Sequence, residues 1–232
     1  MLYRLGFALL WIGFLLYAFL LAPPDDPATL DLIKRMSTGD FAGINPLIVA
    51  EFNLMGLLPL VYISLLLVDG DRQRALGEKI RAWPFALLMM GVGAFALLPY
   101  LILRRPLTGR EPLPPPRNLL LRICQSRWIG GLALPILGLL SYGVLQGDWS
   151  DFVHQWQSSR FIHVMSVDFL LLIALLSFLT SADQVGRQSF PQRILWIPLL
   201  GPLIYLCWRP QLQQPDISTE DPMPTADLSV NT

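Results

Sequence analysis

The chain contains little charge and few of the residues that bind metals or form disulfides. Only 15% of its 232 residues are charged, whereas soluble proteins contain about 25%. The formal net charge is zero, so no extended basic face is available and nucleic acid is not expected as a partner. The two cysteines, Cys124 and Cys207, are too few for a disulfide framework and form no metal-binding pattern with histidine.

Histidine is equally scarce, since only His154 and His163 are present. A haem held by two histidines would need both of them to face one cavity. His154 falls in a segment that is predicted to lie on the membrane surface, so haem is not expected. The residues identify no cofactor, and carotenoid and chlorophyll stay open as ligands.

Long apolar runs dominate what is present. Hydrophobic residues make up 53% of the chain, and several runs approach the length of about 20 residues that a helix needs to cross a bilayer. Hydrocarbon cannot satisfy an unpaired backbone N–H or C=O, so such runs must form helices. The sequence therefore predicts an all-α, polytopic transmembrane helical bundle over residues 1–209. About six spans are expected, at residues 3–21, 46–68, 83–103, 128–145, 160–179 and 190–208.

The segments at the ends of these runs carry their own signals. The apolar run at residues 3–21 is longer than a signal-peptide core, so we predict a retained span. Trp149, Phe152 and Trp156 recur at helical spacing beside polar residues, which predicts a helix in the membrane interface with these rings as anchors. Residues 210–232 are acidic and free of Lys and Arg, which predicts a disordered tail.

The basic residues give conflicting information on orientation. The connection at residues 104–127 holds six arginines and the connection at 146–159 holds none, so the positive-inside rule places the first in the cytoplasm. With six spans, both termini would lie on the opposite side. The basic residues of the segment 72–81 would also lie there, which the rule disfavours.

Asp168 is the most informative single residue. It lies near the middle of the predicted span 160–179 and is followed by a long apolar run. A carboxylate at that depth costs about 2.5–3.5 kcal/mol on insertion scales, so it should face a partner, a cavity or a ligand. Two readings stay open: a structural hydrogen bond between helices, or a direct role in ligand binding or chemistry.

Four further polar residues are candidates for a site that binds a ligand or a partner. Glu51 and Asn53 open the second predicted span, and Arg160 and His163 open the fifth. Because an unpaired charge inside the membrane is costly, we hypothesise that Glu51 pairs with Arg160 or His163. Such a pair would form one polar cluster between these two spans.

Three stretches carry a resemblance to known proteins. Phe-Asn-Leu-Met-Gly at 52–56, Gly-Ala-Phe-Ala-Leu-Leu-Pro-Tyr at 93–100 and Ser-Arg-Phe-Ile-His-Val-Met-Ser-Val-Asp-Phe at 159–169 resemble an uncharacterised family of polytopic membrane proteins of cyanobacteria and plastids. The resemblance covers most of residues 1–210 and implies a photosynthetic membrane, the thylakoid or the plasma membrane of a cyanobacterium. It implies no activity.

A fainter similarity is to the plastid membrane proteins of the neoxanthin-synthase type. Those proteins carry a His-x4-Asp pattern in one span, a further acidic residue, and Gly-Pro in the next span. The matching positions are His163, Asp168, Asp183 and Gly201-Pro202. This similarity implies carotenoid chemistry.

These observations lead to three functional expectations. The first is a non-enzymatic accessory or assembly protein of a thylakoid membrane that contacts the lipid bilayer and binds other membrane proteins, pigment or lipid. The second is an intramembrane enzyme that modifies a carotenoid or another isoprenoid, with Asp168 as the acid and His163 as its helper. The third is a small transporter that uses Asp168 and Glu51, although no inverted repeat is visible in the sequence.

Overall fold

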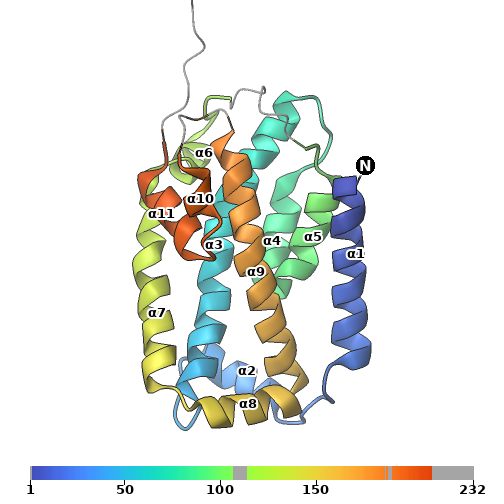
Figure 1. Ribbon diagram of the computed structural model, residues 1–232, viewed down its shortest axis with the longest axis vertical. Coiled ribbons are helices and arrows are strands. Elements are labelled where there is room, and N and C mark those ends of the chain that lie inside the picture. Colours follow the sequence, from blue (N-terminus) through green and yellow to red (C-terminus); the bar gives the residue numbers. More distant parts are fainter. Residues whose placement is uncertain (1, 107–113, 186, 188–189, 211–232) are drawn as a thin grey trace, which may run out of the picture.

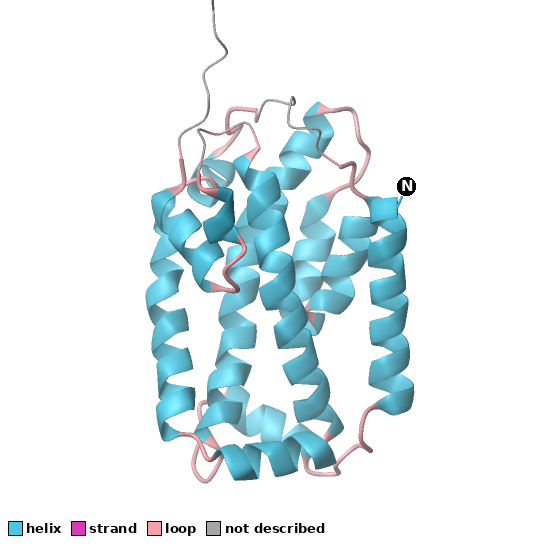
Figure 2. Ribbon diagram, in the orientation of Figure 1, coloured by secondary structure: helices cyan, strands magenta, loops and turns pink. Residues whose placement is uncertain are grey.

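The computed structural model describes residues 2–106, 114–185, 187 and 190–210. The regular elements within these ranges are helices and include no strand (Figure 2), which confirms the all-α class. The predicted tail at 210–232 lies outside the described residues apart from Pro210.

Within the described residues, four helical segments are long and apolar enough to cross a membrane. They are α1 (Leu2–Leu16) with its continuation to Leu21, α3 (Pro46–Ala75), α7 (Ala133–Gln146) with the 3₁₀ segment Arg127–Leu132 before it, and α9 (Arg160–Gln184). In α3 and α9, 56% of the most apolar window is buried, against 11% in α1. Thus α3 and α9 form the centre of the bundle, and most of the surface of α1 faces outward (Figure 1).

The predicted span at 83–103 is not a single helix. It is divided into α4 (Ala82–Val92) and α5 (Ala94–Leu103), which pack against each other in the upper half of Figure 1. The chain reverses at Gly93, whose φ of 52° and ψ of −128° lie in a region open to glycine alone. An 11-residue helix is only about 16 Å long, about half of a bilayer core, so this span is not confirmed.

The predicted span at 190–208 is likewise replaced by a short hairpin. It consists of α10 (Gln192–Leu195) and α11 (Leu200–Trp208), and the reversal includes Leu199 with a positive φ of 58°. A Cβ at Gly201 would lie 1.8 Å from the carbonyl oxygen of Ile194, so the two arms can approach only because residue 201 is glycine. The predicted kink around Pro198 is therefore a reversal of the chain.

Shorter helices cover the two ends of the bundle. α2 (Thr29–Ser37) and α8 (Trp149–Ser158) lie across its lower end in Figure 1, and α6 (Leu119–Cys124) lies at its upper end. α8 carries the three predicted aromatic anchors, as expected from the sequence.

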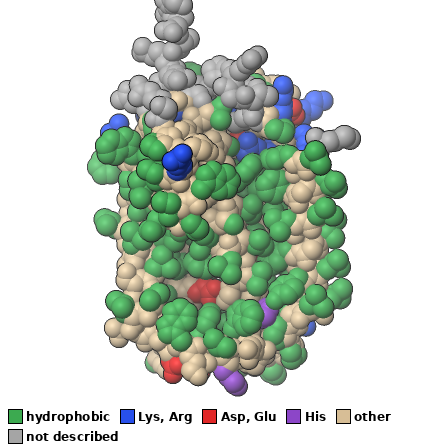
Figure 3. Space-filling view, in the orientation of Figure 1, with side chains coloured by type: hydrophobic (Ala, Val, Ile, Leu, Met, Phe, Trp, Pro, Cys, Tyr) green, Lys and Arg blue, Asp and Glu red, His purple; other side chains and the backbone are tan. Residues whose placement is uncertain are grey.

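The hairpins change the expected orientation. Because α4–α5 returns to the upper end, the segments 72–81 and 104–106 lie at the same end, together with Leu2 and Pro210 (Figure 1). The expectation that the termini lie opposite the Arg-rich connection is therefore wrong. Only Lys34, Arg35 and Arg160 among the described basic residues belong to the lower end, and most blue side chains in Figure 3 gather near the upper end. The segment 72–81 and the Arg-rich connection therefore no longer conflict under the positive-inside rule, because they lie at the same end.

Residues 2–103 and 127–208 repeat the same order of elements. Each half has a long helix running down, a short surface helix, a long helix running up, and a hairpin that stays in the upper half (Figure 1). In each half the first arm of the hairpin packs on the second long helix and the second arm packs on the first. The two halves thus have the same arrangement and run in the same direction, and we call this structural repeat the internal duplication.

A buried ion cluster near the end of each unit supports this equivalence. In the first unit, which we call the Asp69 cluster, the Asp69 carboxylate accepts a hydrogen bond from the Tyr100 hydroxyl at 2.5 Å and pairs with Arg104 at 3.3 Å. All three side chains are buried. The cluster fastens the end of α5 to α3.

The second unit contains the same arrangement, which we call the Asp183 cluster. Asp183 accepts from the Tyr205 hydroxyl at 2.7 Å and pairs with Arg209 at 2.9 Å. Arg187 adds a second ion pair at 3.2 Å. Asp69 and Asp183 occupy the same position, 23 residues after the first residue of their helices. The partners belong to the same pattern, Tyr-Leu-x-x-Arg, at 100–104 and 205–209.

Candidate functional site

Asp168 lies at the tip of the α4–α5 hairpin. Its Oδ1 atom accepts a hydrogen bond from the backbone N–H of Ala94 at 2.8 Å, which is the first residue of α5. A Cβ at Gly93 would lie 1.8 Å from Oδ2, so only glycine permits this approach. The carboxyl group therefore caps a helix N-terminus, where the helix dipole favours negative charge, at a depth of about 12 Å along α9 from Arg160.

No positively charged side chain balances this carboxyl group within the described part of the chain. The ion pairs of those residues involve other carboxylates, and Asp168 is only 4% exposed. An unpaired charge in an apolar surrounding is costly. Its Oδ1 atom accepts from Ala94, and its Oδ2 atom has no hydrogen-bond donor among the described residues.

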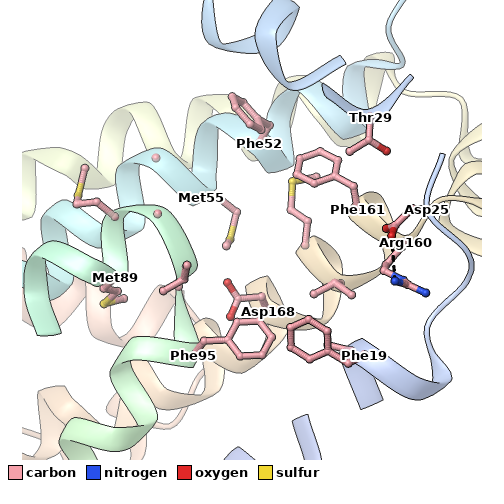
Figure 4. A pocket seen from close by; sticks show the side chains of 18 residues that line it. Phe19, Asp25, Thr29, Phe52, Met55, Met89, Phe95, Arg160, Phe161 and Asp168 are labelled. Atoms are coloured by element: carbon pink, nitrogen blue, oxygen red, sulfur yellow. Dashed lines mark hydrogen bonds and ion pairs between the residues drawn. The ribbon is translucent and has the colours of Figure 1, made fainter. Parts of the chain in front are cut away.

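A cavity of about 500 Å³ lies beside Asp168, and we call it the Asp168 cavity. Side chains from the continuation of α1, from α2, α3 and α9, and from the α4–α5 hairpin line it, and most of them are apolar (Figure 4). Phe19, Met55 and Phe95 lie around the carboxyl group in this view, and Phe52 lies farther away, beyond Met55. The cavity is therefore an apolar pocket with one deep polar group.

Arg160 lies at the lower end of this cavity, not at its deep end. Its guanidinium group pairs with Asp25 at 3.0 Å and donates to the backbone oxygen of Pro23 at 2.8 Å (Figure 4). Asp25 is 75% exposed, which places this pair at the surface. Arg160 and Asp168 thus mark the two polar ends of one cavity.

His163 does not join this site. Its Nδ1 atom lies 2.8 Å from the backbone oxygen of Trp156, and its Nε2 atom contacts the Tyr17 hydroxyl. A carbonyl can only accept, so Nδ1 carries the proton and Nε2 accepts from Tyr17. Both ring nitrogens are engaged, and His163 does not line the Asp168 cavity. The structure therefore does not bring His163 to Asp168 as a catalytic helper.

The predicted polar cluster is divided between two places. Glu51 accepts a hydrogen bond from the Ser166 hydroxyl at 3.0 Å and is paired with neither Arg160 nor His163, so that hypothesis is wrong. Asn53 donates to the oxygen of Val49 in its own helix at 2.8 Å. The reason is depth, because Ser166 lies six residues, or about 9 Å, beyond Arg160 along α9, so Glu51 contacts that helix deeper than Arg160 does.

Glu51 borders a second cavity of about 380 Å³, which we call the Glu51 cavity. The predicted anchors Trp149, Phe152 and Trp156 line it together with residues of α3, α7 and α9. The sequence pattern indicated an interfacial helix but contained no signal that its rings would close a pocket.

The described residues contain no group of three His, Cys, Asp or Glu side chains that could hold a metal ion. Comparison of the chain with protein-family models, with curated proteins and with solved structures finds no match.

Proposed function

We propose that this protein is an integral membrane protein that binds an amphiphilic, membrane-soluble molecule in the Asp168 cavity. The observation that carries the proposal is the buried Asp168 carboxyl group, which faces an apolar cavity and has no ion-pair partner in the part of the chain that the structure describes. A ligand hydroxyl or amine that donates to Oδ2 would complete its hydrogen bonding. The apolar body of the ligand would replace lipid along Met55 and Phe95.

The size and chemistry of the cavity narrow the ligand class. Its volume of about 500 Å³ falls in the usual range for drug-sized ligands, about 300–1,000 Å³. Haem and chlorophyll need an axial ligand on the metal, and both nitrogens of His163 are already engaged. A hydroxylated isoprenoid, such as the polar end of a carotenoid or an isoprenoid alcohol, is therefore the ligand we propose.

The membrane setting is part of the same proposal. We propose that the two hairpins replace the third and sixth expected spans as re-entrant segments that enter from the cytoplasmic end and return. The resemblance supports a photosynthetic membrane, with the protein acting as an accessory or assembly factor. The largely exposed apolar surface of α1 would suit contact with lipid or with another membrane subunit.

The proposal is tested by purifying the protein in mild detergent and analysing the extract by absorption and mass spectrometry. The wild type is compared with Asp168→Asn and with Asp40→Asn, a control at an exposed carboxylate. We expect one amphiphile enriched over bulk lipid in the wild type and the control, and reduced about tenfold in Asp168→Asn because a charge-assisted hydrogen bond is lost. Extracts that match bulk lipid in all three proteins would refute the proposal.

A second candidate, a transporter, is favoured by the duplication. Transporters are often built from repeats with interrupted helices in corresponding positions, and here both hairpins are interrupted, at Gly93 and around Leu199. Reconstituted vesicles that accumulate a labelled isoprenoid alcohol with wild-type protein, but not with Asp168→Asn, would support it. If the protein bound the alcohol without net transfer into the vesicles, the result would support ligand binding, the first proposed function, and not transport.

A further inference from the structure

The two cavities are related by the internal duplication. The Asp168 cavity is lined by the first long helix of unit one and by both α3 and α9, and the Glu51 cavity is lined by the first long helix of unit two and by the same pair. In the internal duplication α1 corresponds to α7, and α3 corresponds to α9. The Asp168 cavity beside α1 therefore corresponds to the Glu51 cavity beside α7.

The acid of each cavity comes from the long helix of the opposite unit. Asp168 on α9 lies in the cavity beside α1, and Glu51 on α3 lies in the cavity beside α7. With Asp69 and Asp183 as reference points, Asp168 stands 15 residues before its reference and Glu51 stands 18 residues before its own. The difference of three residues is about one helical turn, so the two acids lie on similar faces at neighbouring depths.

Glu51, like Asp168, is a buried carboxyl group with one oxygen atom that accepts no hydrogen bond from the described residues. It is 8% exposed, and its Oε2 atom accepts from Ser166. Within the described residues its Oε1 atom has no hydrogen-bond partner, and the carboxylate has no ion-pair partner. A buried carboxyl group with one free oxygen thus faces a second apolar cavity.

We propose that the Glu51 cavity is a second binding site for the same class of amphiphile, so that one chain holds two molecules. This inference rests on the proposed function. The donor of the second molecule would reach Oε1 of Glu51, and its apolar body would lie between α7 and α9 along Val144 and Leu170. Trp149 and Trp156 of α8 close the lower end of the cavity.

The two sites differ in one respect that predicts their relative strength. The α4–α5 turn covers the Asp168 cavity, but no residue of α10–α11 lines the Glu51 cavity. The Glu51 cavity is also smaller, at about 380 Å³. The second molecule should therefore bind more weakly and exchange faster with the surrounding lipid.

The probe for both sites is a hexadecanol that carries a photoreactive diazirine, added to the full chain in nanodiscs. Its methyl ether, which lacks the donor, is the matched control. Peptide mass spectrometry then locates the labelled residues. We expect labels around Met55 and Phe95 for the first site and on α8 for the second, with the ether labelling both about tenfold less.

Two amide variants separate the sites. Glu51→Gln keeps the acceptor for Ser166 and should reduce only the α8 labels, whereas Asp168→Asn should reduce only the labels of the Asp168 cavity. Val144→Trp, which fills the Glu51 cavity, checks the first result should Glu51→Gln fail to fold. Alcohol-specific labels at the Asp168 cavity alone would overturn the second site and leave the proposed function intact. Equal labelling by alcohol and ether at both places would overturn both.

Discussion

In both units an Asp, a Tyr and an Arg side chain hold the hairpin to the bundle, but the carboxylate of the second unit makes more contacts. In the Asp183 cluster two arginines contact the carboxylate, and Arg209 forms two hydrogen bonds with it. In the Asp69 cluster Arg104 makes a single contact at 3.3 Å, and its Nε and Nη1 atoms lack a partner in the described part of the chain. The second cluster is therefore the more complete one.

The two hairpins also differ in the other contacts that hold them to the bundle. The α4–α5 hairpin is fastened twice, at its upper end by the Asp69 cluster and at its tip by Asp168. The α10–α11 hairpin has arms of four and nine residues and no capping acid at its reversal, since Leu199 has no side-chain cap. Further hydrogen bonds join this hairpin to the bundle, from Gln192 to Ser181 and from Cys207 to the oxygen of Gly130. Both involve uncharged groups, so the shorter hairpin depends more on its buried ion cluster.

The largest predicted effect follows from this comparison. Asp183→Asn leaves the buried Arg187 and Arg209 side chains without a counter-charge, and breaking a buried pair in this way costs about 3–5 kcal/mol. Asp69→Asn leaves only Arg104 without a counter-charge, so we expect the free energy of unfolding to fall by an amount near the lower end of that range. The free energy of unfolding is measured by titration of the detergent-solubilised protein with sodium dodecyl sulfate, followed by circular dichroism.

The contrast between the clusters is checked by removing the hydroxyl partners. Tyr205→Phe and Tyr100→Phe each delete one hydrogen bond to the carboxylate, which is worth about 1.5–3 kcal/mol when the acceptor is charged. If Asp69→Asn lowered the free energy of unfolding as much as Asp183→Asn or more, the α10–α11 hairpin would not depend on its cluster more than the α4–α5 hairpin does.

The second prediction concerns the fastening that only the first unit has. Gly93→Ala introduces a Cβ 1.8 Å from Asp168 Oδ2 at a positive φ, and we expect a loss of about 2–4 kcal/mol from backbone strain and overpacking. Because the carboxyl group must move, binding in the Asp168 cavity should fall as well. The same unfolding titration and the probe-labelling experiment measure the two effects.

Gly91→Ala is the matched control for this variant. Gly91 lies two residues earlier, inside α4, and a Cβ there meets nothing within 4 Å, so alanine should leave the stability unchanged or raise it slightly. A Gly93→Ala protein as stable as Gly91→Ala would mean that Asp168 does not hold the hairpin tip.

The four long helices and the surface helices could be predicted from the sequence because their signals are local. Length and hydropathy identify spans, and aromatic spacing identified α8. The depth of Asp168 also marked it as a residue in need of a partner. Hydropathy does not distinguish a helix that continues from one that reverses at Gly93, since apolar residues lie on both sides of the reversal.

The duplication could have been found from two short patterns. Tyr-Leu-x-x-Arg occurs at 100–104 and 205–209, and each copy follows an acid at the end of a long apolar run. The pairing of Asp69 with Arg104 is a contact across 35 positions and has no local signal. The separation of Glu51 from Arg160 also depends on how the helices rotate in the bundle, which their sequences alone do not specify.

The smallest predicted effect tests whether solvent explains the strength of the ion clusters. Arg160 and Asp25 form an ion pair at 3.0 Å, as close as Asp183 and Arg209 at 2.9 Å, but Asp25 is 75% exposed and the Arg209 side chain is fully buried. Water screens the exposed pair, so Asp25→Asn should cost less than about 0.5 kcal/mol.

Salt distinguishes the two pairs further. At about 1 M ionic strength the Debye length falls to about 3 Å, so the remaining effect of Asp25→Asn should vanish, whereas the loss in Asp183→Asn should persist because ions cannot reach the buried cluster. The unfolding titration is repeated at low and high salt in a non-ionic denaturing system to measure this. If salt abolished the effect of Asp183→Asn as well, the cluster would be open to water, and the stability of the second hairpin would have to come from the packing of α11 on the 3₁₀ segment before α7.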